Sequence, residues 1–113
     1  MSDLNRVILI GRLTRDPELR YTPAGTAVAS FSLANNYSYS KDGEKKEKVS
    51  YFDCVAWSKL GEIITEHCKK GTAIAIEGRL DQQRWDDQDG QKKSKIEIVV
   101  EGFNFVGGKK DGE

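Results

Sequence analysis

Five β-rich segments separated by turn signals constrain the fold of this chain more than any other feature of its sequence. Valine, isoleucine, tyrosine, phenylalanine and tryptophan gather in these segments, and such residues favour strands. The segments lie within residues 6–13, 28–40, 47–57, 69–85 and 93–106. Asp42-Gly43 and Asp89-Gly90 separate two neighbouring pairs of them, and Asp-Gly is typical of hairpin turns. We therefore expect a mainly β protein built from hairpins.

A single short helix is predicted between the third and fourth β-rich segments, in the stretch SKLGEIITEHCKKG. Ser58 is expected to cap its start, and Lys69, Lys70 and Gly71 to form its end. Its expected apolar face consists of Leu60, Ile63, Ile64, His67 and Cys68. Gly61 costs about 1 kcal/mol relative to alanine, so packing has to hold this helix.

This order of elements predicts an all-β fold class. Five strands with one short helix between the third and fourth are the layout of an OB-fold, a five-stranded, partly open Greek-key barrel. Other small barrels share the pattern, so the order of elements alone leaves them open.

The segment VSYFDCVAW raises a question about function. Side chains of a strand alternate between its two faces. Phe52, Cys54 and Ala56 are expected to face the core. The other face would carry Tyr51, Asp53, Val55 and Trp57. Large aromatic rings would then lie on the same face as an aspartate.

Aromatic and basic residues occur together near the predicted strand ends and hairpin arms. The aromatic residues are Tyr37, Tyr39, Tyr51, Trp57 and Trp85, and the basic residues near them in sequence are Lys41, Lys59, Arg84, Lys92 and Lys93. A protein that binds single strands without sequence preference stacks bases on rings and contacts phosphates with cations. The alternative is that the rings pack in the core or at a contact between subunits.

Composition restricts the other classes of function. The chain has 113 residues, which suits one domain, and its 18 basic and 18 acidic residues cancel, so only the arrangement of charge can favour a polyanion. The two cysteines and one histidine fit no common zinc pattern and no disulfide framework. The apolar run near the N-terminus is too short for a signal peptide or a membrane span, so we expect a cytoplasmic protein without a membrane partner.

The sequence gives little support to an enzyme. His67 and Cys68 are adjacent, so on a helix their side chains point about 100° apart, a poor arrangement for a base and a nucleophile. The acidic run near Asp86 is better explained by a solvated hairpin tip than by a metal cage. We expect no catalysis, no metal and no cofactor.

Several stretches together resemble the bacterial single-stranded DNA-binding protein family. They are residues 5–34, 69–80, 84–91 and 96–107, which cover almost the whole chain. The resemblance implies an OB-fold that forms homotetramers and coats single-stranded DNA during replication, recombination and repair. It also implies stacking residues Tyr39, Tyr51, Trp57 and Trp85, and phosphate-binding residues Arg6, Arg20, Lys59, Lys70 and Arg84.

The chain also departs from the family pattern. Many members carry Trp where this chain has Tyr39 and Tyr51, and Phe where it has Trp57. Asp53 and the segment 81–83 stand where relatives often have basic or neutral residues, which weakens the electrostatic track and predicts a shallow salt dependence.

The expected domain is 1–107, followed by a short polar end, 108–113. The family's long tail with an acidic tip does not follow it, so either the sequence is a truncated piece or the protein is a short member of the family. Recruitment of replication and repair proteins through a tail is therefore in doubt. Two non-enzymatic alternatives remain open: a primosome-type accessory module that binds proteins as much as DNA, and a purely structural oligomerisation barrel.

Overall fold

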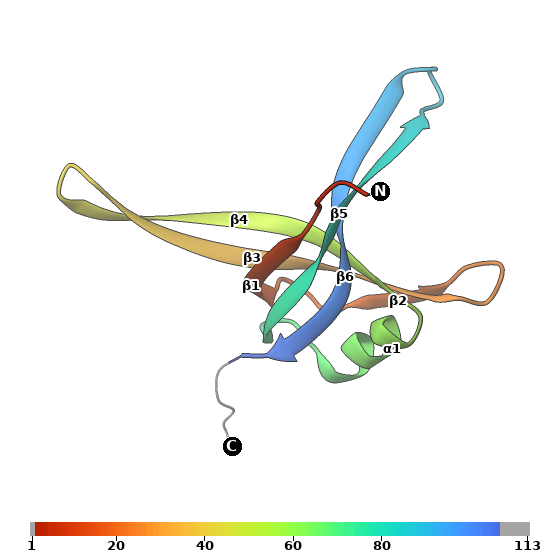
Figure 1. Ribbon diagram of the computed structural model, residues 1–113, viewed down its shortest axis with the longest axis horizontal. Coiled ribbons are helices and arrows are strands. Elements are labelled where there is room, and N and C mark those ends of the chain that lie inside the picture. The colour runs from red at the N-terminus through yellow and green to blue at the C-terminus, as the bar shows by residue number, and fades with distance from the viewer. Residues whose placement is uncertain (1, 107–113) are drawn as a thin grey trace.

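The computed structural model describes residues 2–106. In chain order the elements are β1 (Val7–Leu13), β2 (Glu18–Tyr21), β3 (Ala27–Lys41), β4 (Glu44–Trp57), α1 (Ser58–His67), β5 (Ala73–Asp86) and β6 (Lys92–Phe105), as Figure 1 shows. The expected polar end, 108–113, and the last residue of the expected domain lie outside the described residues.

The strands form a closed barrel. Their order is β1-β5-β6-β4-β3-β2, and an additional pairing of β1 with β3 closes the sheet. Closure rests on Arg12 opposite Ala34 and Leu13 opposite Leu33. The pairing of β4 with β6, at Cys54–Ile98 and Val55–Val99, is parallel, whereas the other pairings are antiparallel. The five barrel strands are β1, β3, β4, β5 and β6, and α1 lies between the third and fourth of them, which confirms the predicted OB-fold.

The strand β2 was not expected. It pairs only with β3, from Glu18–Ser30 to Tyr21–Ala27. Its sequence, ELRY, gives a weak strand signal because the segment has only four residues, two of them charged. β2 extends the sheet beyond the five barrel strands.

Hairpins extend from the barrel as long arms. The β3–β4 pairing continues to Lys41 opposite Glu44, and the β5–β6 pairing continues to Asp86 opposite Lys92. Figure 1 shows that these two arms leave the barrel in different directions. Asp42 and Gly43 have φ values of 54° and 79°, as a tight turn between twisted strands requires. The two predicted hairpins are therefore confirmed.

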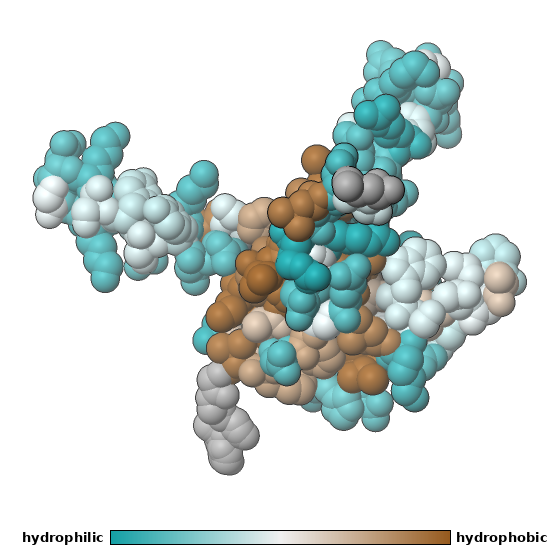
Figure 2. All heavy atoms as spheres, in the orientation of Figure 1, coloured by the Kyte–Doolittle hydropathy of each residue, from teal (hydrophilic) through white to brown (hydrophobic). Residues whose placement is uncertain are grey.

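The core lies inside the barrel and under α1. It consists of Leu13, Phe31, Leu33, Cys54, Ala56, Ile64, Cys68, Ile74, Ile76, Ile98 and Val100. Each large aliphatic or aromatic side chain buried in this way contributes about 1.5 to 3 kcal/mol. In Figure 2 the hydrophobic residues gather on the barrel, whereas the β3–β4 and β5–β6 arms are mostly hydrophilic.

The helix differs from its prediction at both ends. Ser58 does not cap it: Trp57 occupies the cap position without a side-chain hydrogen bond, and Ser58 begins the helix with φ of 58°. The helix ends at His67, because Cys68 is already extended although its N–H still donates to the carbonyl oxygen of Ile64. His67 was predicted on the apolar face but lies on the exposed side of the helix, since its side chain is 55% exposed.

The predicted faces of the strand 47–57 need two corrections. Cys54 and Ala56 face the core, as predicted, but Phe52 is 37% exposed because β4 leaves the barrel near the position where Leu33 closes it. Val55 belongs to the outer face, as predicted, yet it is only 8% exposed. It forms the floor of a groove whose walls come from neighbouring strands.

Candidate nucleic-acid interface

A groove of about 390 Å³ on the outer surface brings together side chains from five strands, β2 to β6. We call it the aromatic groove, and it is lined by Arg20, Val28, Ser30, Val55, Trp57, Gln83, Trp85, Lys95 and Glu97. Trp57 and Trp85 are 46% and 47% exposed, so part of each ring is open to a ligand. Two tryptophans that are distant in sequence therefore share one open surface.

Strand alternation explains which residues reach this groove. Val55 and Trp57 are two positions apart on β4, and Gln83 and Trp85 are two apart on β5, so each pair shares a face. Lys95 is directly opposite Gln83 in the β5–β6 pairing. The parallel contact of β4 with β6 then places the C-terminal end of β4 beside the β5–β6 hairpin.

The groove continues into a smaller depression of about 190 Å³. The two share Ser30, Val55, Lys95 and Glu97, and the depression adds Arg15 and Asp53 together with the buried Phe31 and Cys54. Its charged lining contains both signs. This surface is not a uniformly positive track.

Asp53 lies in this depression without a close cation. None of the ion pairs within residues 2–106 includes it. Burial, followed by the carboxylates of Asp53 and Glu97, raises the pKa of the Cys54 thiol to about 12. The thiol is therefore protonated at neutral pH and is no nucleophile.

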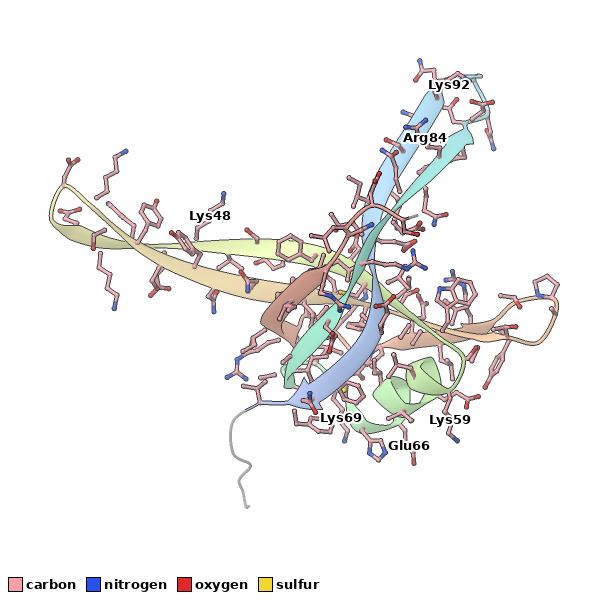
Figure 3. All side chains as sticks on the ribbon, in the orientation of Figure 1. Lys48, Lys59, Glu66, Lys69, Arg84 and Lys92 are labelled. Atoms are coloured by element: carbon pink, nitrogen blue, oxygen red, sulfur yellow. The ribbon has the colours of Figure 1, made fainter. Side chains whose placement is uncertain are left out.

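Trp85 also lines a third surface, on the β5–β6 arm. This depression of about 550 Å³ is lined by Gln82, Arg84, Trp85, Asp86, Lys92, Lys93 and Ser94. The Arg84 Nε donates to the Gln82 side-chain oxygen at 3.0 Å, and Lys92 lies 3.4 Å from Asp86. Figure 3 shows Arg84 and Lys92 on this arm.

The predicted tyrosines lie elsewhere. Tyr39 and Tyr51 belong to the β3–β4 ribbon, where they are 39% and 67% exposed, and neither lines the aromatic groove. Tyr51 pairs with Ala34 and Tyr39 with Lys46, so the register assigns them to alternate faces of the ribbon. The structure brings together the two tryptophans but not all four predicted rings.

The predicted basic residues also divide into two groups. Arg20 lines the aromatic groove and Arg84 lies beside Trp85 on the arm. Arg6, at 2.8 Å from Glu77, and Lys59 and Lys70 line none of the three depressions. Lys59 lies on α1, far from Lys92 in Figure 3. The backbone N–H of Lys70 donates to Asp16 at 2.8 Å.

Two cations of this surface were missed by the sequence reasoning. They are Lys95, which lines the groove and its extension, and Arg15, which lines the extension. Lys95 could have been found, because it is two positions from Lys93, which lies directly opposite Trp85. Arg15 lies between β1 and β2 and gives no such signal.

Within residues 2–106 there is no group of three His, Cys, Asp or Glu side chains that could hold a metal ion. No helix in that range is long and apolar enough to cross a membrane. Half-exposed rings can stack on flat groups, and the cations beside the rings can contact anions.

Comparisons with known proteins agree with this description. The family described as "Single-strand binding protein family" matches residues 4–106. A "Single-stranded DNA-binding protein" of Treponema pallidum is 45% identical over 107 residues, covering 95% of this chain and 60% of that protein. "Single-stranded DNA-binding protein 3" of Listeria innocua is 42% identical over 109 residues, with coverages of 96% and 68%. The chain thus spans about three fifths to two thirds of the length of these relatives.

A solved structure shows the same arrangement of strands. "Plasmodium falciparum SSB complex with ssDNA" superimposes with a TM-score of 0.85 at 26% sequence identity. The match covers 95% of this chain and 98% of that one.

Proposed function

This chain belongs to the single-strand binding protein family, and we propose from that premise that it binds single-stranded DNA without sequence preference. Bases stack on the half-exposed tryptophans, and neighbouring cations contact the phosphates. The observation that carries the proposal is that Trp57 and Trp85 line one groove with Arg20 and Lys95. A duplex would be bound poorly, because its stacked bases cannot reach the rings.

The proposed role is binding rather than catalysis. By coating exposed single strands the protein would protect them during replication, recombination and repair. Because a protein with this role lies with the DNA that it binds, the proposed location is the cytoplasm, in association with the nucleoid. The proposal requires neither a metal nor a cofactor.

A fluorescence titration tests the function. An oligo-dT strand is added while tryptophan emission is followed, with a duplex of equal length as control. Strong quenching by the single strand alone is expected, because a base stacked on an indole ring changes its emission. Absence of binding by the single strand would contradict the proposal and turn attention to protein partners.

We also propose that the chain assembles as a homotetramer, which the resemblance predicts. The support is an apolar outer face on β1, where Ile8 and Ile10 are 74% and 54% exposed. β1 pairs with β5 along most of its length but with β3 only at Arg12 and Leu13, so most of its other edge is unpaired. An open edge beside exposed isoleucines favours burial against another copy.

The assembly is measured by the mass of the native particle in solution. Ile8→Asp should lower that mass, because a carboxylate would be buried in the interface. Ser38→Asp introduces the same charge on the exposed β3–β4 arm and should leave the mass unchanged. A monomeric wild-type protein would exclude the tetramer and leave DNA binding to be judged separately.

A further inference from the structure

Tyr37 and Tyr39 form an exposed aromatic pair outside the aromatic groove. Their ring centroids are 6.0 Å apart and their planes differ by 19°. Residues two positions apart on a strand lie on one face, about 6 to 7 Å apart, which lets the rings stack on each other. Tyr37 is 63% exposed and Tyr39 is 39% exposed. Much of both rings is therefore open to solvent.

The pair has no apolar partner across the ribbon. Tyr37 lies opposite Lys48 and Tyr39 opposite Lys46. A stacked pair of rings contributes about 0.5 to 1.5 kcal/mol of stability beyond the effect of the area that it buries. That contribution is small for two large rings that remain exposed. Local packing alone is a weak explanation for this pair.

The face that carries the rings is positively charged. The same face holds Lys41, Lys46 and Lys48 and one acidic residue, Glu44, which lies 3.2 Å from Lys46. The alternate positions hold Ser38 and Ser40 opposite Glu47 and Lys45, whose charges cancel. Cations are therefore concentrated beside the rings. Figure 3 shows Lys48 on this arm.

The arm is fixed to the barrel at its base, on this same face. The Asn35 side-chain amide donates to the carbonyl oxygen of Ile10 at 2.8 Å. Asn35 is two positions before Tyr37, so this bond holds the start of the arm against β1. The rings thus project from an anchored ribbon.

We propose that Tyr37 and Tyr39 act together as a platform that stacks the bases of a single DNA strand along the β3–β4 arm. Lys46 and Lys48 contact the phosphates beside it. The inference rests on the proposed function and adds Tyr37, which the family resemblance did not supply, to the stacking residues. The register places Tyr37 and Tyr39 on the opposite face of the β3–β4 ribbon from Val55 and Trp57, so the platform is a second contact surface for the bound strand, separate from the aromatic groove.

Binding measurements on variants test this platform. Tyr37→Ala should weaken binding of an oligo-dT strand long enough to reach both surfaces by about 5- to 150-fold, the effect of one stacked base. Tyr37→Phe keeps the ring and should bind like the wild type. Ser38→Ala, next to it on the other face, should also bind like the wild type.

A photochemical contact measurement separates DNA stacking from a structural role. Oligonucleotides containing 5-iododeoxyuridine crosslink to aromatic side chains that touch the base. We expect a crosslink within the tryptic peptide 21–41 that fragmentation assigns to Tyr37 or Tyr39. Weaker binding by Tyr37→Ala without such a crosslink would overturn the proposal, as would a changed native mass, which would make the pair a protein contact.

Failure of this inference is distinguishable from failure of the function. If Tyr37→Ala binds like the wild type while Trp57→Ala and Trp85→Ala lose affinity, the platform is wrong and single-strand binding stands. If the wild-type protein binds no single strand, the proposed function itself fails.

Discussion

Trp57 and Trp85 line the same groove, although Trp57 ends β4 and Trp85 lies near the outer end of β5. The helix α1 and most of β5 separate them in the chain. Their meeting depends on the parallel contact between β4 and β6, which places the C-terminal end of β4 beside the β5–β6 hairpin. A strand bound in the groove can therefore contact both rings at once.

Removal of either tryptophan should weaken DNA binding. Trp57→Ala and Trp85→Ala are each expected to lower the affinity for oligo-dT by about 5- to 150-fold, which corresponds to the 1 to 3 kcal/mol of one stacking contact. Phe at either position keeps a smaller ring and should retain most of the affinity. Fluorescence anisotropy of a labelled strand measures the change.

Tyr21→Ala provides a matched control for these variants. Tyr21 is 59% exposed on β2 but lines none of the three depressions. Its removal should leave the affinity unchanged. Equal losses from Tyr21→Ala and Trp85→Ala would contradict the assignment of binding to the groove.

The acidic lining of the groove should oppose DNA binding. Asp53 has no ion pair within the described residues and lies in a depression with Arg15 and Lys95. Asp53→Asn removes a charge that repels phosphates, so affinity at low salt should rise. The gain should shrink at high salt, where screening weakens the repulsion.

Lys95 has the opposite expected effect. Lys95→Gln should lower affinity and reduce the magnitude of the salt slope by about 0.7 if one phosphate contact is lost. Lys69→Gln removes the same charge from an exposed lysine that lines none of the three depressions, and it serves as the charge control. An unchanged salt slope in Lys95→Gln would show that this lysine contacts no phosphate.

Local sequence signals predicted much of the fold and part of the site. The Asp-Gly turns and the common core-facing side of Cys54 and Ala56 depend on near neighbours in the chain, so they could be predicted from the sequence. Exposure of Phe52 and burial of Val55 depend on where β4 leaves the barrel and on what surrounds it. Arg15 reaches the groove extension through the arrangement of separate strands, which no local pattern reveals.

Gly61 illustrates a residue whose identity the helix pattern misjudges. Its position looked unfavourable for a helix, yet a Cβ there would overlap the carbonyl oxygen of Ala56 and lie 3.2 Å from the backbone nitrogen of Ala29. The glycine lets α1 approach β3 and β4 closely. The sequence pattern indicated only that packing has to hold the helix. The structure shows that this packing requires a glycine at position 61.

Gly61→Ala should therefore destabilise the protein. Helix propensity alone favours the alanine by about 1 kcal/mol, whereas overpacking against the backbone typically costs about 1 to 3 kcal/mol. We expect the overlap to dominate and the free energy of unfolding to fall, because both neighbouring groups belong to the backbone. Urea denaturation measures it, with Glu62→Ala on the exposed side of the helix as control. Stabilisation by Gly61→Ala would show that the close approach is absent.

Cys54 should make stability fall at alkaline pH. Burial, with Asp53 and Glu97, raises the pKa of its thiol from 9.0 to about 12 in the folded state. Above pH 9 the unfolded chain loses this proton while the folded protein still holds it. The stabilisation that the protonated Cys54 contributes is therefore complete below pH 9 and is lost as the pH rises to about 12. Within that window the free energy of unfolding should fall by up to about 1.4 kcal/mol per pH unit.

Urea denaturation of the wild type and of Cys54→Ala across this pH range isolates the effect. The alanine variant should be less stable at neutral pH, because it leaves a small cavity in the core. Its stability should nevertheless decline less steeply above pH 9, since all other groups are the same in both proteins and only the Cys54 contribution differs. Parallel declines would show that Cys54 ionises as easily in the folded protein as in the unfolded chain, against the burial seen here.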